Sequence, residues 1–130
     1  LTPYEKDMLQ EAGNKVLLLY MRGSIIFGAS RAISRRNSEV EGREALVVDM
    51  TDMKHLGVSS SLALEQAILD MVRAGRNVYV AGAGEQPRKR LENLGLLEHI
   101  PRKHFQDTRA NALQLAVFGP AGTANADSEG

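Results

Sequence analysis

Short apolar runs separated by polar turns dominate the first half of the chain. Residues 16–21 (VLLLYM) and 45–48 (ALVV) are apolar throughout and too short for independent helices, which is typical of strands buried on both faces of a sheet. Residues 24–27 (SIIF) follow the first run so closely that we expect them to pair with it antiparallel. Residues 77–81 (NVYVA) predict a fourth strand, and we expect the strand at 45–48 to end at Asp49.

Helical spacing marks the segment between the third and fourth strands. Its apolar residues recur at i, i+4, i+7 and i+8, which places them on one face of an α-helix: Leu64, Ile68, Met71 and Val72. The spacing predicts a helix over residues 60–74, with a cap from one of the serines at 59–61. Gly75 is a natural residue to end it in the left-handed conformation.

Other helices are indicated by their end signals. Thr2 and Glu5 have the spacing of a capping box around Pro3, which predicts a short first helix ending near Gly13. Further helices are expected over three segments: residues 31–37, from Pro87 to Gly95, and from an Asp107 cap onward with Ala110, Leu113 and Val117 on one side.

Strand–helix–strand units in this order predict a parallel sheet with right-handed crossovers, and the initial hairpin makes that sheet mixed. We therefore expect an α/β domain, a small mixed β-sheet covered by α-helices, over residues 15–118. A short helix at 1–14 precedes it. Residues 119–130 are poor in apolar side chains and are expected to form a disordered tail.

Composition restricts the possible functions. One hundred and thirty residues suit one domain, and 16 basic residues balance 16 acidic ones, so the chain lacks the net positive charge that draws proteins to nucleic acid. The absence of cysteine excludes disulfides, thiolate metal sites and cysteine nucleophiles. No apolar run is long enough to span a bilayer.

A Gly-x-Gly turn after the fourth strand raises the possibility of a nucleotide-binding enzyme. Gly82 and Gly84 could let backbone amides approach a pyrophosphate. Pro87, however, stands at the place of the third glycine, and no strand with a ribose-binding acid follows. We expect no cofactor here and interpret the turn as a strand-to-helix connection.

Titratable residues give no catalytic or metal-binding constellation. His55, His99 and His104 lack the spacing of a metal site and are expected in loops or at the surface. Asp49, Asp52 and His55 lie close in sequence, but no nucleophile or metal partner accompanies them. Asp49 is expected to accept hydrogen bonds from nearby backbone amides. The chain is therefore not expected to be an enzyme.

The order of several motifs resembles the STAS domain, a module found in bacterial anti-sigma-factor antagonists and at the cytoplasmic end of SulP anion transporters. The segments that carry the resemblance are residues 45–51 (ALVVDMT), 75–82 (GRNVYVAG) and 91–97 (LENLGLL). The Gly-x-x-x-Phe-Gly-Ala form at 23–29 is more similar to the transporter branch. Within that branch the chain resembles cyanobacterial sodium-dependent bicarbonate transporters.

The resemblance also identifies a possible regulatory turn. In the antagonist branch an Asp-Ser-Ser-Gly turn carries a phosphorylated serine, and the corresponding positions here are Gly57, Val58, Ser59 and Ser60. Val58 takes the place of the phosphorylated serine and cannot accept phosphate. Only a shift of register to Ser59 or Ser60 could restore such a switch.

The resemblance implies a cytoplasmic regulatory or assembly domain at the cytoplasmic face of a bacterial plasma membrane. Residues 1–14 would be a linker from the transmembrane domain of the same transporter, and the domain would act as a homodimer through this linker and the first strand. Basic clusters at 31–36, 88–90 and 102–103 could contact anionic lipid. The alternatives are a stand-alone anti-sigma-type antagonist and a nucleotide-binding enzyme.

Overall fold

The computed structural model describes residues 2–12, 15–22, 25–28 and 44–124. Its main elements are α1 (Pro3–Ala12), β1 (Val16–Arg22), β2 (Ile25–Gly28), β3 (Ala45–Asp52), α3 (Val58–Arg73), β4 (Asn77–Ala81), α4 (Glu85–Asn93), β5 (Phe105–Gln106) and α5 (Arg109–Ala124). Two short 3₁₀ turns, η1 (Leu96–Glu98) and η2 (Arg102–His104), lie between α4 and β5.

The sheet has the strand order β2-β1-β3-β4-β5. β1, β3, β4 and β5 run parallel, and β2 pairs antiparallel with β1, so the expected mixed sheet is confirmed. β5 was not expected, because two residues are too few to show an alternating pattern. β1 lies between β2 and β3, and its residues Leu19–Arg22 pair with β2, so this part of β1 does not offer a free strand edge to a second copy of the chain.

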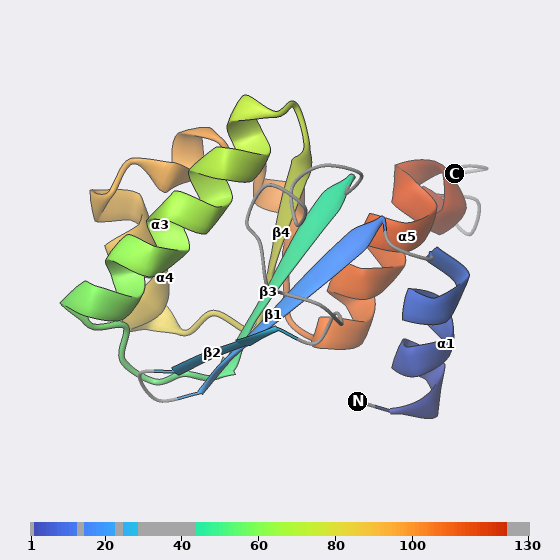
Figure 1. Cartoon of the computed structure of the whole chain (residues 1–130), viewed down its shortest axis with the longest axis horizontal. Coiled ribbons are helices and arrows are strands. Elements are labelled where there is room, and N and C mark those ends of the chain that lie inside the picture. The colour runs from blue at the N-terminus through green and yellow to red at the C-terminus, as the bar shows by residue number, and fades with distance from the viewer. Residues whose placement is uncertain (1, 13–14, 23–24, 29–43, 125–130) are drawn as a thin grey trace.

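Helices cover both faces of the sheet, with α3 and α4 on one side and α1 and α5 on the other (Figure 1). Alternation along β1 divides its side chains between two cores. Leu17, Leu19 and Met21 belong to the core beneath α3 and α4. Val16 and Leu18 belong to the smaller core beneath α5.

α3 confirms the predicted apolar face and corrects the predicted cap. Leu64, Ile68 and Met71 are buried, Val72 packs against them, and Gly75 follows with a φ of 76°. The cap is Gly57, in extended conformation, and no serine side chain caps the helix. The three serines lie inside the first turn instead, where the Ser61 hydroxyl donates to the Val58 carbonyl at 2.7 Å.

Other element boundaries also differ from those expected. β3 continues past Asp49 to Asp52, because Asp49 still pairs with Ala81 of β4 and Met50 is fully buried. α4 begins at Glu85 after Gly84, two residues before Pro87. Gly95 ends this helical region in the left-handed conformation, as expected. The predicted helix over 31–37 lies outside the described residues.

The last helix is capped by Thr108 instead of Asp107. The Asn111 backbone N–H donates to the Thr108 hydroxyl at 3.1 Å. α5 breaks at Gly119, where φ is 73° and ψ is 176°, and helical backbone then continues to Ala124. The start of the expected tail is therefore helical, and residues 125–130 lie outside the described part. Among the described residues, no helix is long and apolar enough to cross a membrane.

The first helix begins as its sequence predicts. The Thr2 hydroxyl accepts the Glu5 backbone N–H at 3.1 Å, and the Glu5 carboxylate accepts the Thr2 N–H at 2.9 Å. These reciprocal bonds form a capping box, which satisfies two backbone donors that a helix start leaves open.

Candidate functional site

A pocket of about 280 Å³ lies between the end of β3, the start of α5 and α1. Side chains at alternate positions along β3 face α5, which brings Asp49 and Thr51 to this side of the sheet. The pocket lining combines the carboxylates Glu5, Asp49, Asp52 and Asp107 with the Arg109 guanidinium.

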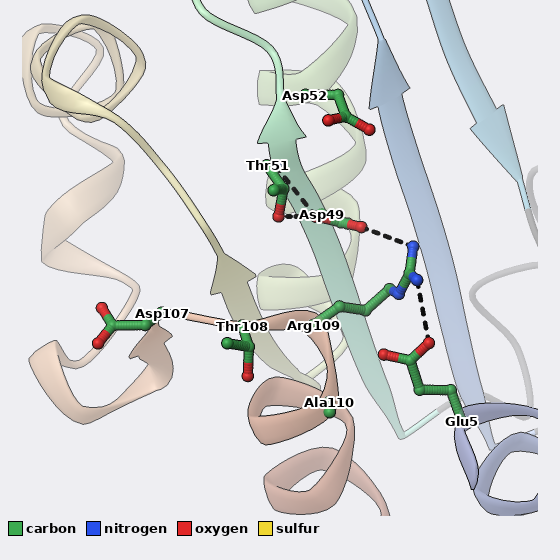
Figure 2. Close-up of a pocket in the computed structure, with 8 residues that line it drawn as sticks. All are labelled: Glu5, Asp49, Thr51, Asp52, Asp107, Thr108, Arg109 and Ala110. Atoms are coloured by element: carbon green, nitrogen blue, oxygen red, sulfur yellow. Dashed lines mark hydrogen bonds and ion pairs between the residues drawn. The ribbon is translucent and has the colours of Figure 1, made fainter. Parts of the chain in front are cut away.

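Arg109 joins three elements of the fold. It is the first residue of α5, and its guanidinium lies between Asp49 and Glu5 (Figure 2). Nη1 is 3.0 Å from the Asp49 Oδ2 atom, and Nη2 is 3.0 Å from the Glu5 Oε1 atom. The arrangement is an ion-pair chain from α1 through α5 to β3, which we call the Arg109 cluster.

Asp49 anchors the cluster in the sheet. The residue is only 2% exposed, and its Oδ1 atom accepts the Thr51 backbone N–H at 3.0 Å and the Thr51 hydroxyl at 2.6 Å. The expected role of Asp49 as an acceptor for a backbone amide is thus confirmed. Its second oxygen binds Arg109, so both carboxylate oxygens have charged or polar partners, as a buried charge requires.

Glu5 anchors the other end of the cluster in α1. Its side chain is only 5% exposed. Burial raises the pKa of the Glu5 carboxyl, but hydrogen bonds from Arg109 and Thr2 and the positive charge of Arg109 together lower it by more, so this pKa lies below its ordinary value. The hydrogen bond to Glu5 in turn raises the pKa of Arg109. Both groups are therefore charged at neutral pH.

The remaining acidic residues of the pocket do not join the cluster. Asp52 accepts a hydrogen bond from the Tyr20 hydroxyl, and this bond raises the pKa of Tyr20. Asp107 points away from Arg109 (Figure 2). His55 is exposed and does not line the pocket. Within the described part of the chain, no group of three or more His, Cys, Asp or Glu residues could hold a metal ion.

The structure explains why residue 82 is glycine without a bound nucleotide. Its φ is 66°, and a Cβ atom placed there would lie 2.4 Å from the Thr51 hydroxyl oxygen. A left-handed backbone and a close neighbour both favour glycine. Gly84 serves as the cap of α4. The Gly-x-Gly turn thus packs beside Thr51, which is hydrogen-bonded to Asp49.

The possible regulatory turn lies at the start of α3. Gly57 is the cap, and Val58 is the first helical residue, with 64% of its surface exposed. Ser59 is exposed, whereas Ser60 is buried. The position expected to correspond to the phosphorylated serine of the antagonist branch thus carries an exposed apolar side chain.

The three histidines match the prediction only in part. His55 and His99 are exposed, as expected, but His104 is buried. The Nδ1 atom of His104 lies 2.8 Å from the Val78 carbonyl oxygen, and its ring stacks on Tyr79. Burial lowers the pKa of His104, so its role is that of a neutral core residue.

The described basic clusters are solvent-facing. Arg88, Lys89, Arg102 and Lys103 are exposed. Lys89 forms an ion pair with Glu92 at 3.5 Å, and Arg88 lies over the Phe105 ring. The cluster at 31–36 lies outside the described residues.

The fold described above places the chain in the class of small α/β domains with a mixed sheet between two helical layers. The family model of the STAS domain matches residues 8–112. The chain belongs to the STAS domain family, and the expected fold is confirmed.

Curated relatives include the bicarbonate transporter BicA of Synechocystis sp., which is 41% identical over 118 residues. BicA of Picosynechococcus sp. is 41% identical over 119 residues. The aligned regions cover 91% and 92% of this chain but 21% of each transporter. The chain thus spans about a fifth of the length of the curated relatives it matches.

Solved structures agree on the fold. The STAS domain of a SulP transporter from Vibrio cholerae has a TM-score of 0.60 at 13% identity, with 98% of each chain covered. A sulfate transporter family protein from Wolinella succinogenes has a TM-score of 0.58 at 14% identity, over 78% of this chain and 84% of that one.

Proposed function

We propose that the chain is the cytoplasmic regulatory and assembly domain of a SulP-type anion transporter that takes up bicarbonate together with sodium. The observation that carries the proposal is the 41% identity to two bicarbonate transporters over almost the whole chain. Because the aligned region is a fifth of each relative, the residues that select and move the anion belong outside this segment. The domain then regulates or assembles the transporter and catalyses no reaction.

Residues 1–14 connect this domain to the transmembrane domain of the same transporter, and residues 15–118 form the regulatory unit. The ion pair between Glu5 and Arg109 joins the connecting helix to this unit. Tethering raises the effective concentration of two copies to roughly millimolar, so a weak contact suffices for a homodimer. Since β1 is an internal strand and Leu19–Arg22 pair with β2, α1 is the stronger candidate for the contact.

Contact with the anionic cytoplasmic leaflet is a further part of the proposal. It is supported by the exposed basic residues of α4 and η2, which are Arg88, Lys89, Arg102 and Lys103. Each basic residue near such a surface adds on the order of 1 kcal/mol of attraction.

A stand-alone anti-sigma-type antagonist is the second candidate. Its switch needs a serine at the start of α3, and the exposed Val58 occupies that position. This replacement favours the transporter assignment. A nucleotide-binding enzyme is disfavoured because the packing of Gly82 against Thr51 accounts for the glycine.

The test is sodium-dependent bicarbonate uptake by the full-length transporter with two substitutions on α3. Ile68→Asp places a carboxylate in the core, whereas Leu62→Asp changes a residue that is 55% exposed. We expect loss or misregulation of uptake with Ile68→Asp at matched membrane abundance, and normal uptake with Leu62→Asp. Normal, normally regulated uptake by both variants contradicts a regulatory role.

A further inference from the structure

We propose that the Arg109 cluster is a releasable clamp that sets the orientation of α1 on the domain, with α1 as the moving part. The consequence for transport rests on the proposed function, because it requires α1 to lead to the membrane domain. The clamp itself is a property of this chain and can be tested without the transporter.

α1 is attached at its start by a charge in place of an apolar side chain. Among residues 2–7, the part of this segment whose side chains are described, Glu5 is buried and the others are exposed. An apolar side chain gains free energy on burial in any orientation. A buried carboxylate is stable only where its partner stands in the correct place. The contact at Glu5 therefore specifies one orientation of the start of α1, and this contact is lost when the ion pair opens.

The same oxygen atom holds the start of α1 and the ion pair. Glu5 Oε1 accepts the Thr2 backbone N–H at 2.9 Å and lies 3.0 Å from Arg109 Nη2. Rotation of the Glu5 side chain would open both contacts at once. Release of the start of α1 from Arg109 is thereby linked to loosening of the first turn of α1.

The other side of the clamp is fixed. Arg109 follows the Thr108 cap of a long helix, and its Nη1 atom binds Asp49 inside the sheet. Asp49 is held in turn by two hydrogen bonds from Thr51, and Thr51 packs against Gly82. When the clamp opens, Arg109 stays with the sheet and α1 moves.

Arg109 can lose Glu5 without becoming a buried unpaired charge. Its side chain is 25% exposed, and it borders the pocket, so water can solvate the Nη2 atom after release. The depressed pKa of Glu5 keeps the carboxylate charged at neutral pH. Protonation of Glu5 is therefore not what opens the clamp at neutral pH. In this proposal, the clamp opens when α1 is displaced mechanically, for example by a movement of the segment to which it connects.

The chain contains no cysteine, so two introduced cysteines can carry a spin-label pair with no background. Tyr4→Cys on α1 and Leu62→Cys on α3 are suitable because both side chains are more than half exposed. The distance distribution between the labels is measured by pulsed electron paramagnetic resonance on the whole chain. The labelled parent is expected to give one narrow distance.

Two variants are designed to open the clamp, and a third is a matched control. Arg109→Gln removes the central charge. Glu5→Gln keeps an acceptor for the capping box, since glutamine also serves at that position, but removes the ion pair. Both are expected to broaden the distribution and add a longer component. Lys89→Gln removes a charge from an exposed pair and should leave the distribution unchanged.

If Arg109→Gln does not fold, as judged by its circular dichroism spectrum, Glu5→Gln decides, because it leaves Asp49 paired. A narrow, unshifted distance in Glu5→Gln overturns the clamp, whatever the transporter does. The proposed function fails separately. If Glu5→Gln releases α1 and the full-length transporter still assembles and takes up bicarbonate normally, the clamp stands and its role in transport is wrong.

Discussion

The two faces of the sheet are stabilised in different ways. Beneath α3 and α4 lies the larger core, which includes Leu64, Ile68 and Met71 and draws its strand residues from three parallel strands. Beneath α1 and α5 the apolar core is smaller and borders the Arg109 cluster. Apolar burial stabilises without regard to direction, whereas an ion-pair chain requires one geometry. The first face thus supplies stability, and the second fixes how α1 joins the domain.

The largest expected effect lies in the first face. Ile68→Asp would bury an unpaired carboxylate among apolar side chains and is expected to destabilise the domain by about 4 kcal/mol or more. Leu62→Asp on the exposed side of the same helix should change stability by less than about 0.5 kcal/mol. Urea unfolding followed by circular dichroism measures both. Equal midpoints for the two variants would show that the face of α3 is wrongly assigned.

The second face predicts a smaller loss. Arg109→Gln leaves Asp49 and Glu5 buried without their cation. Removing one partner of a buried pair costs about 3–5 kcal/mol, and the partial exposure of Arg109 reduces this to about 2–3 kcal/mol. Lys89→Gln at the exposed pair should cost less than about 0.5 kcal/mol. A loss as small as that of the control would mean that the cluster contributes orientation alone.

A glycine comparison tests the junction between Asp49, Thr51 and the turn after β4. Gly82→Ala must adopt a positive φ and place its Cβ against Thr51, so we expect a loss of about 2 kcal/mol. Gly75→Ala is the control, because it shares a positive φ of 76° but its Cβ would meet no atom within 4 Å, so its loss should be the smaller one. Thermal unfolding measures both. A stable Gly82→Ala variant that binds nucleotide would revive the nucleotide-binding interpretation.

The pH dependence of stability tests the lowered pKa of Glu5, with a smaller expected effect. Its pKa in the folded chain lies below the usual value of 4.5. A lowered pKa stabilises the fold at pH values above the unfolded pKa, and this contribution is lost as the pH falls through the folded one. The unfolding free energy of Glu5→Gln should therefore fall less steeply than that of the parent below about pH 4.5. Parallel curves would contradict the assigned ion pair.

The smallest effect is expected at the regulatory turn. Val58 is expected to correspond to the phosphorylated serine of the antagonist branch, and no serine caps α3. Ser59→Ala should therefore leave stability and regulated uptake unchanged. Uptake by the full-length transporter and mass spectrometry of Ser59 check this. Phosphate on Ser59 together with lost regulation in Ser59→Ala would show that the switch has moved by one position.

The sequence predicted the periodic parts of the fold and missed the contacts between distant segments. The helix predicted from the spacing of Leu64, Ile68 and Met71 depends on local geometry, and this prediction was correct. β5 was missed because its two residues rely on pairing with β4 for their strand conformation. The serine cap was wrong because Gly57 reaches the extended backbone of a cap without a side-chain bond.

The candidate site was predicted only in part. Glu5 was expected in a capping box and Asp49 as an acceptor for a backbone amide, and both are correct. Their link through Arg109 was missed, because Asp49 and Arg109 are sixty residues apart and meet only when β3 and α5 pack. A buried aspartate after an apolar strand needs a cation, but that rule cannot select Arg109 from 16 basic residues.

The most direct test of the central claim is crosslinking of the intact transporter in membranes, with and without residues 1–130, combined with bicarbonate uptake by the same preparations. We expect the full-length protein to crosslink as a dimer and to take up bicarbonate normally. The truncated protein, at equal membrane abundance, should lose the dimer, normal uptake or both. A truncated transporter that remains dimeric and transports normally would contradict the assignment of this domain to regulation and assembly.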